Sequence, residues 1–219
     1  MDLIRIKDKI EHFKSENKKL FLTSSFQGYS IVLIHIISSI DKNIPIYFIN
    51  TGYHFVETLT YRDNIAKLLS LNIKNVSSQI PKIQQIDSNS HLLYVSDPDY
   101  CCFINKVQPM DKLFFEYDVW INGIRKEQNE HRKTLEEIEN APNNTVRYHP
   151  LINWTKEECE DYIKTHKLPK HPLSSQGYKS IGCEPCTIKN NHTEDERGGR
   201  WNGLKKNECG LHTELIIKK

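Results

Sequence analysis

The fold is decided by the segment Leu20-Phe21-Leu22-Thr23-Ser24-Ser25-Phe26-Gln27-Gly28, which continues into the apolar run 31–37. A short apolar run, a loop of hydroxyls and glycine, and a second apolar run predict a buried strand, a tight loop and a buried helix. Such a loop offers backbone N–H groups and the positive end of a helix dipole to a phosphate. Serine and glycine also serve for tight turning alone, and these residues leave that alternative open.

A second unit of the same kind follows. Residues 44–49 have the pattern of a strand, Asn50-Thr51-Gly52 forms its loop, and a helix is expected over 56–69. This alternation of strands and helices predicts a parallel sheet. Because ligands of such sheets lie beyond the carboxyl ends of the strands, we expect the loops 24–28 and 50–52 side by side at a nucleotide site.

The remaining elements extend outward from these two units. Helices are expected at 3–19, 103–114, 125–140 and 155–164, and strands at 73–76, 118–122 and 145–148. The basic residues at the start of the charged helix 125–140 are spaced to pair with its glutamates. Arg125 is the exception, because it follows a glycine turn at a strand's end. No function can be read from residues 77–99.

Composition narrows the classes of function. A chain of 219 residues with 37% hydrophobic residues fits one domain plus a terminal extension. A net charge of +2 gives no argument for a nucleic-acid partner. No run approaches the roughly 18 apolar residues of a membrane span. Together with six cysteines, four of them in close pairs, this favours a cytoplasmic protein whose thiols are ligands or catalysts rather than disulfides.

Two cysteine pairs, Cys101-Cys102 and Cys183-Glu184-Pro185-Cys186, form a candidate metal site. The second spacing lets two thiolates bind one centre from a tight turn. Adjacent thiolates point apart, which suits two irons of a cluster better than one tetrahedral zinc ion. A thioredoxin-type redox motif and four free buried thiols are the alternatives. Cys159 has no partner at ligand spacing, so we expect a small buried residue there.

A fifth thiol, Cys209, lies in the terminal stretch Glu208-Cys209-Gly210-Leu211-His212. A tail thiolate that enters a site lined by Arg197 and Arg200 would have a lowered pKa, which makes a reactive nucleophile. The two guanidinium forks suit sulfate or phosphate oxygens. The alternatives are an idle tail cysteine, salt bridges from the arginines to neighbouring acidic residues, and a solvated His212.

Together these segments resemble the adenylylsulfate reductases of assimilatory sulfate reduction, within the wider phosphoadenylylsulfate reductase family. The matching segments are 24–28, 50–58, 101–102, 123–128, 180–187, the arginine segment ending at Trp201, and 208–212. The resemblance implies an adenine nucleotide α-hydrolase-like (Rossmann-like) α/β fold, with a parallel sheet flanked by helices and a flexible C-terminal tail. It also implies a nucleotide-binding reductase domain with an iron–sulfur cluster over 1–190. A C-terminal segment with the arginine motif and the catalytic cysteine would occupy 191–219.

The resemblance also assigns roles to single residues. The ligands of a [4Fe–4S] cluster would be Cys101, Cys102, Cys183 and Cys186, and the catalytic nucleophile would be Cys209. The substrate-binding residues would be Ser24, Ser25, Phe26, Gly28, Thr51, Gly52, Lys106, Arg125, Arg197 and Arg200. Family members that take the 3′-phosphorylated substrate generally lack the four-cysteine set, so adenylylsulfate itself is favoured.

The reaction implied is reduction of adenylylsulfate to sulfite and AMP. It would pass through an S-sulfonate on Cys209 that thioredoxin, or a glutaredoxin-like thiol donor, releases. The cluster would act electrostatically, and a homo-oligomer is compatible with the resemblance. The alternatives are a phosphoadenylylsulfate reductase and a non-catalytic nucleotide-binding protein with a four-cysteine metal site. An ATP pyrophosphatase would need a fuller Ser-Gly-Gly-x-Asp-type loop than 24–28 provides.

Overall fold

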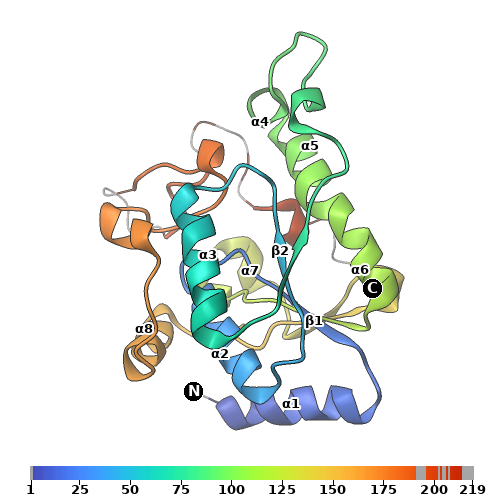
Figure 1. Ribbon diagram of the computed structural model, residues 1–219, viewed down its shortest axis with the longest axis vertical. Coiled ribbons are helices and arrows are strands. Elements are labelled where there is room, and N and C mark those ends of the chain that lie inside the picture. The colour runs from blue at the N-terminus through green and yellow to red at the C-terminus, as the bar shows by residue number, and fades with distance from the viewer. Residues whose placement is uncertain (1, 191–195, 202, 204–205, 207, 214–219) are drawn as a thin grey trace.

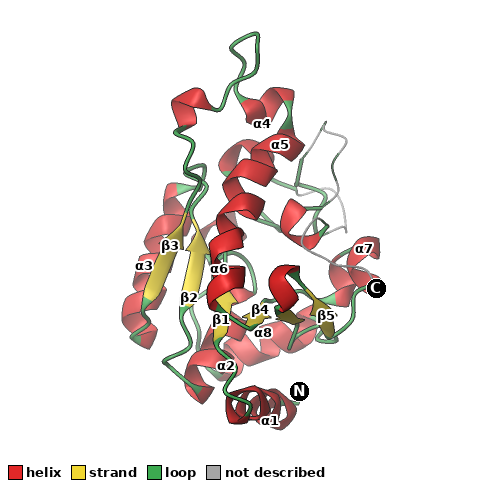
Figure 2. Ribbon diagram, turned by 90° about the vertical axis from the view of Figure 1, so that its right-hand side faces the viewer, coloured by secondary structure: helices red, strands yellow, loops and turns green. Residues whose placement is uncertain are grey.

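A six-stranded sheet forms the centre of the molecule (Figures 1 and 2). The computed structural model describes residues 2–190, 196–201, 203, 206 and 208–213. The strand order is β3-β2-β1-β4-β6-β5. The strands are β1 (Leu20–Thr23), β2 (Ile46–Ile49), β3 (Ile73–Val76), β4 (Val119–Ile121), β5 (Ile138–Asn140) and β6 (Val146–Tyr148). Neighbouring strands are parallel except for β5 and β6, so the parallel sheet predicted from the sequence is confirmed, with one antiparallel edge strand added.

The two faces of the sheet are covered by different helices. The helices are α1 (Leu3–Ser15), α2 (Ser30–Ile40), α3 (Val56–Leu69), α4 (Leu93–Ser96), α5 (Pro98–Cys102), α6 (Asp111–Glu116), α7 (Glu130–Lys133) and α8 (Lys156–Thr165). Leu20 and Leu22 of β1 point to the face that packs against α1, α2, α3 and α8. Phe21, between them, points to the opposite face and packs with residues of α6. This alternation follows from the two-residue period of a strand.

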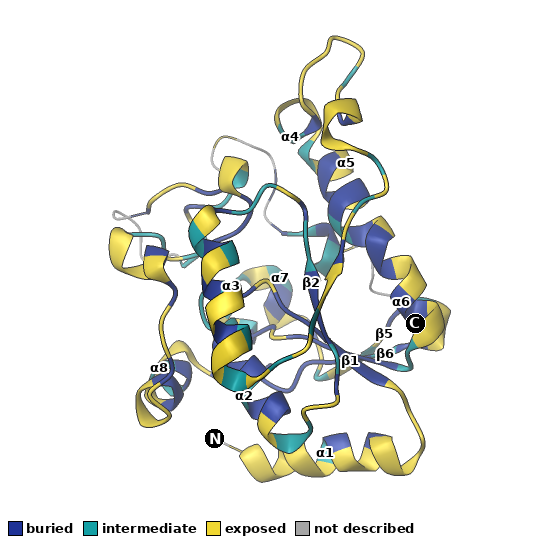
Figure 3. Cartoon of the chain, viewed as in Figure 1, coloured by how far each residue is buried: buried dark blue, intermediate teal, exposed yellow. Residues whose placement is uncertain are grey.

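Figure 3 shows that burial follows this layering, with buried residues along the central strands and exposed ones on the outer faces of α1 and α3. All four residues of β1 are buried, as expected of a central parallel strand covered on both sides. The loop that follows β1 therefore leaves the sheet from a fully buried central strand. No helix in the described part of the chain is both long enough and apolar enough to cross a membrane.

The single helix expected over 125–140 is wrong. The segment contains a 3₁₀ turn at Lys126–Gln128, the short helix α7, and the strand β5. Asn143 and Asn144 adopt left-handed conformations, with φ of 56° and 59°, and so reverse the chain between β5 and β6. The paired strands satisfy backbone groups that a longer helix would have satisfied locally, and this tertiary pairing outweighs the helical charge pattern.

A nearly continuous helical rod carries the first cysteine pair. It begins with α5, passes through a π-helical turn at Phe103–Val107 and a 3₁₀ turn at Gln108–Met110, and ends with α6 (Figure 1). Pro109 removes one helical N–H donor, and the change of helix type beside it accommodates that loss. The segment 77–99, which the sequence left uninterpreted, forms a projecting arm that leads into this rod.

Candidate active site

The loop after β1 is fixed from beneath by the core. Phe26 has a φ of 54°, and its side chain is fully buried among apolar residues. Its backbone N–H donates a hydrogen bond of 3.0 Å to the hydroxyl of Ser24. Gly28 follows with a φ of 47°, a conformation that suits glycine. The buried ring therefore turns the polar groups of the loop outward.

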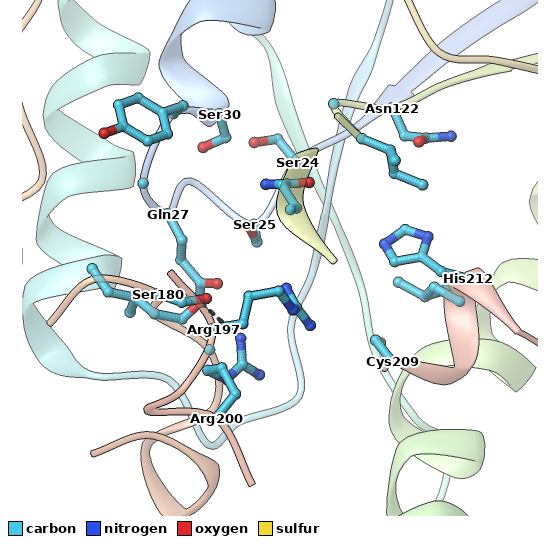
Figure 4. A pocket seen from close by; sticks show the side chains of 18 of the residues that line it. Ser24, Ser25, Gln27, Ser30, Asn122, Ser180, Arg197, Arg200, Cys209 and His212 are labelled. Atoms are coloured by element: carbon cyan, nitrogen blue, oxygen red, sulfur yellow. Dashed lines mark hydrogen bonds between the residues drawn. The ribbon is translucent and has the colours of Figure 1, made fainter. Parts of the chain in front are cut away.

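A cavity of about 220 Å³ lies beside this loop, beyond the carboxyl ends of β1 and β4. In Figure 4, Gln27 and Ser180 lie on one side of it, and Cys209 and His212 on the other. Most of the predicted substrate-binding residues and the predicted nucleophile contribute to its lining. These are Ser24, Ser25, Gly28, Thr51, Lys106, Arg125, Arg197, Arg200 and Cys209.

Two predicted substrate-binding residues do not line this cavity. The side chain of Phe26 belongs to the core. Gly52 has a φ of 68° and faces the side chain of Lys82, whose Cε lies 2.2 Å from where a Cβ would stand. Their predicted contact with substrate stays a prediction. In the structure, the Phe26 side chain anchors the loop in the core. The missing side chain of Gly52 leaves space for the side chain of Lys82.

Four cysteine side chains converge on a second, smaller cavity, although their two pairs are about eighty residues apart in sequence. Cys101, Cys102, Cys183 and Cys186 all line it, and all four are free thiols. The second pair is held there by backbone contacts to the loop after β2, since the N–H of Glu184 donates to the carbonyl of Tyr53 at 2.7 Å. Across the described residues, no three histidine, cysteine or acidic side chains are grouped as ligands of a single metal ion.

Lys106 lies between the two cavities and lines both of them. Burial alone would lower the pKa of its ammonium group, but the surrounding cysteine sulfurs, with Cys183 first, raise that pKa well above its usual value. The lysine is therefore charged when the neighbouring sulfurs are thiolates. Thr51 and Cys183 also belong to both linings, and the threonine hydroxyl lies 3.3 Å from the cysteine sulfur.

The thiol of Cys209 faces the larger cavity directly before a 3₁₀ turn at Gly210–His212. A hydrogen bond from the thiol of Cys102, together with the charge of Lys106, holds the pKa of Cys209 well below its usual value. The same hydrogen bond raises the pKa of Cys102. These directions favour the thiolate of Cys209, which is the nucleophilic form of cysteine.

The three predicted arginines reach the cavity from different directions. Arg125 is almost fully buried, lies 5.0 Å from the Tyr29 ring centroid, and pairs with Glu127 and, at 3.2 Å, with Glu196. Arg125, which the sequence singled out because it follows a glycine turn at the end of a strand, thus lies in the wall of the cavity. Arg197 and Arg200 both lie over the ring of Trp201.

The indole of Trp201 supports both arginines of the C-terminal motif. The guanidinium carbons of Arg197 and Arg200 lie 5.3 and 4.5 Å from its ring centroid. Arg200 also donates to the carbonyl of Ile181 at 3.1 Å, and its guanidinium occupies the space that a Cβ on Gly182 would need. Burial lowers the pKa of Arg197 to about 10, so this group remains charged at neutral pH. The two cations are fixed in place before any ligand arrives.

Of the alternatives that the sequence left open for His212, the structure does not show the solvated one. Its Nδ1 accepts a hydrogen bond of 2.6 Å from Arg147, and its carbonyl oxygen accepts one of 2.7 Å from His131. Burial and the nearby charges of Arg132 and Arg147 hold the pKa of His212 well below its usual value. The imidazole is therefore neutral, and its Nε2 carries the proton.

Sequence reasoning missed Arg132, Asn122 and Glu208. The charge pattern of the helix predicted over 125–140 pairs its basic residues, Arg132 included, with its own glutamates, but Arg132 is buried, lines the cavity and pairs with Glu208. Asn122 also lines the cavity, and its place directly after a strand and before Gly123 was a usable signal. Glu208 could have been suspected only from its place beside Cys209.

Comparison with known proteins places this site in a family. A model of the phosphoadenosine phosphosulfate reductase domain matches residues 19–189. The chain belongs to the phosphoadenosine phosphosulfate reductase family. The matched span contains the loop after β1 and all four paired cysteines, whereas Arg197, Arg200 and Cys209 lie beyond it.

Other members of this reductase family are similar over nearly the whole chain. The adenosine 5′-phosphosulfate reductase of Chelativorans sp. (strain BNC1) is 38% identical over 205 residues, which are 93% of this chain and 82% of that protein. Adenosine 5′-phosphosulfate reductase 2 of Bacillus subtilis (strain 168) is 33% identical, with 92% and 86% covered.

A solved structure of a phosphoadenylyl-sulfate (PAPS) reductase from Candida auris, in a phosphate complex, shares the fold. It superposes with a TM-score of 0.68 at 24% identity, and the match covers 83% of this chain and 89% of that one. The α/β fold expected from the resemblance, with a mainly parallel sheet flanked by helices, is thereby confirmed.

Proposed function

We propose that this chain is an adenylylsulfate reductase, which reduces adenylylsulfate to sulfite and AMP. The observation that carries the proposal is the position of Cys209. Its activated thiol faces a cavity that also contains the serine loop after β1 and the side chains of Lys106, Arg197 and Arg200. A nucleophile, a nucleotide-type loop and fixed cations at one cavity suit transfer of an anionic group from a nucleotide. The similar proteins named adenosine 5′-phosphosulfate reductase support the same substrate.

The first step is attack of the Cys209 thiolate on the sulfur of adenylylsulfate. A sulfur–sulfur bond forms, the bond from that sulfur to the phosphate oxygen breaks, and AMP leaves with the electron pair. The product on the protein is a cysteine S-sulfonate. Lys106, Arg197 and Arg200 would stabilise the charge that develops on the departing phosphate, since they are held in place before the reaction.

The second step needs a dithiol from outside the cavity. Of the described cysteines, only Cys102 shares a hydrogen bond with Cys209, and we assign it to the metal site. One thiolate of a thioredoxin, or of a glutaredoxin-like donor, attacks the Cys209 sulfur and expels sulfite. The donor's second thiolate then attacks the mixed disulfide and regenerates the Cys209 thiolate. The dithiol thus supplies the two electrons that convert sulfate-level sulfur to sulfite.

We also propose that Cys101, Cys102, Cys183 and Cys186 hold a [4Fe–4S] cluster. Four free thiols from two chain segments around one small buried cavity form a donor set suited to such a cluster. When bound, the cluster would tune the electrostatics of the neighbouring site. A ligand thiolate has no proton to donate, so the charge of Lys106 is then the main stabiliser of the Cys209 thiolate.

The proposed nucleophile is tested with Cys209→Ser. We expect no AMP or sulfite from adenylylsulfate and thioredoxin, and no S-sulfonated protein by intact-mass analysis. Cys159→Ala is the matched control, because Cys159 is a fully buried free thiol away from the cavity, and this variant should turn over. Normal turnover by Cys209→Ser would overturn the assignment. Parallel assays with the 3′-phosphorylated nucleotide separate this function from that of a phosphoadenylylsulfate reductase.

The metal proposal is tested on protein purified without oxygen. We expect iron and acid-labile sulfide in equal amounts, with an absorption band that disappears on oxidation. Zinc without sulfide would contradict the cluster. Cys186→Ser should lose iron while AMP binding persists, because the nucleotide loop after β1 lies on a different element.

A further inference from the structure

A buried carboxylate anchors the segment that carries the reactive thiol. The side chain of Glu208 is only 4% exposed. Oε2 accepts hydrogen bonds from Arg132 Nε at 2.7 Å and Asn129 Nδ2 at 2.8 Å. Oε1 accepts from Arg132 Nη2 and Arg197 Nη2, both at 3.0 Å. A carboxylate has about four acceptor sites, so these four contacts already occupy its usual capacity.

The same carboxylate also binds the backbone of the nucleophile. The N–H of Cys209 donates to Glu208 Oε1 at 2.8 Å, and this oxygen is the one that both arginines contact. One carboxylate oxygen therefore connects the Cys209 backbone to the guanidinium groups of Arg132 and Arg197, which line the cavity. Glu130, on the same short helix as Arg132, is by contrast 88% exposed and pairs with Lys133.

The arginines that hold Glu208 are also cations of the cavity. Removal of a buried ion-pair partner leaves an uncompensated charge, so Arg132 and Arg197 favour a docked Glu208. An anionic substrate that enters the cavity meets these two cations already neutralised in part. Glu208 therefore helps to fix the position of the Cys209 thiol. Its negative charge also reduces the attraction of Arg132 and Arg197 for an anionic substrate.

We propose that Glu208 is a positioning residue, which fixes the Cys209 thiol at the cavity through Arg132 and Arg197. For the role of Cys209 this inference rests on the proposed function. Glu208 itself touches no reacting atom. Its loss should slow formation of the S-sulfonate without weakening nucleotide binding, because the positive charges of Arg132 and Arg197 are then less neutralised.

The test compares Glu208→Gln with the control Glu130→Gln. The first readout is deuterium exchange in the peptide that contains Cys209, which requires no turnover. The second is the single-turnover rate of S-sulfonate formation, and the third is the affinity for AMP. For Glu208→Gln we expect faster exchange, a sulfonation rate lower by about tenfold or more, and AMP affinity unchanged or tighter. Glu130→Gln should match the unaltered protein in all three.

The outcomes separate the alternatives. Unchanged exchange, or faster exchange with an unchanged sulfonation rate, overturns the positioning role. Loss of AMP affinity in parallel with the rate shows a general structural role and also overturns it. If the unaltered protein forms no S-sulfonate at all, the proposed function fails, and the exchange result still shows whether Glu208 holds the tail. Glu208→Asp is a further check, because a shorter carboxylate should restore pairing only in part.

Discussion

The loop after β1 and the segment around Cys209 face the same cavity but are held by different forces. The loop is fixed by apolar burial, with the Phe26 ring fully inside the core. The tail, here the segment 208–213, is fixed largely by polar contacts, above all those of Glu208 with Arg132 and Arg197, and Leu211 adds one partly buried apolar contact. Apolar burial is non-directional and holds the loop as long as the domain is folded. Buried ion pairs offset much of their attraction by desolvation, so a tail held by them can open without unfolding the domain.

This difference suits the proposed reaction. The nucleotide must meet the same loop in every cycle, whereas the thiol must meet first a nucleotide and then a protein dithiol. A segment docked through a few ion pairs can serve both encounters. The predictions below test whether the loop and the tail respond as differently as their contacts imply.

The largest expected effect is on the loop. Phe26→Ala should lower the free energy of unfolding by about 3–5 kcal/mol, because it leaves a cavity in the core. The measurement is urea denaturation followed by far-ultraviolet circular dichroism. Val56→Ala is the control, since Val56 is 73% exposed, and it should change stability by less than about 0.5 kcal/mol. Equal effects of the two substitutions would show that the loop does not depend on core burial.

Acid should weaken the packing of α3 against the turn that begins after His171. Burial lowers the pKa of His171 to about 4, and its ring bonds to Thr58 and to the N–H of Leu173. Between the usual pKa near 6.5 and the folded value the unfolded chain binds more protons, so stability falls as pH falls through this window. At pH 5 the loss is about 2 kcal/mol for this histidine.

The check is the urea midpoint measured between pH 7 and 5. His171→Gln should flatten this dependence, whereas a substitution of the exposed His12 should not. A slope that His171→Gln leaves unchanged would assign the acid sensitivity to other groups, of which buried His149, with its pKa also lowered to about 4, is the first to test.

Two glycines give a matched comparison of loop and tail. Gly28 and Gly203 both have positive φ, 47° and 77°, and a Cβ on either would meet no atom within 4 Å. Alanine therefore adds backbone strain of about 1 kcal/mol at each position without a steric clash. Gly28→Ala should lower the unfolding free energy by that amount. Gly203→Ala should leave it unchanged and instead raise deuterium exchange in the tail. The same response at both sites would contradict the separate anchoring of the tail.

The smallest expected effect is at an exposed ion pair. Arg5 and Glu137 are 2.6 Å apart, with side chains 45% and 28% exposed. Arg5→Ala should cost less than about 1 kcal/mol of stability, and added salt should remove the difference. Tail exchange should be insensitive to the same salt, because Arg132 and Glu208 are buried. Thermal denaturation at two salt concentrations, with exchange measured in parallel, checks both statements.

The sequence predicted the loop better than the tail, and the reason is physical. Apolar periodicity and loop chemistry are local, so β1, its serine loop and α2 could be read from consecutive residues. The ion pair of Arg132 with Glu208 joins residues 76 positions apart, and local charge spacing pointed instead to a partner on the same helix. The same charge pattern produced the wrong helix over 125–140, where strand pairing decided the structure.

In the candidate site too, the sequence predicted what depends on local spacing and missed what depends on the folded backbone. Cysteine spacing indicated two pairs that share a centre, and the structure brings all four thiols to one cavity. The pattern could not place Phe26 in the core or direct Gly52 toward Lys82, because the direction of a side chain depends on backbone angles that only the folded loop defines. The arm at 77–99 is held by turns and side-chain hydrogen bonds within itself and by the pairing of Gln85 with Asn105 of the cysteine-bearing rod, and neither kind of contact follows an apolar period that the sequence could show.

The two cavities share a wall made by Thr51, Lys106 and Cys183. Whatever fills the larger cavity therefore covers one approach to the thiols of the smaller one. A bound nucleotide would act as a shield, which limits the entry of oxygen and chelators to the cysteine cavity. The resting enzyme would be the state most vulnerable to oxidative damage, and its lifetime in air would depend on how much nucleotide surrounds it.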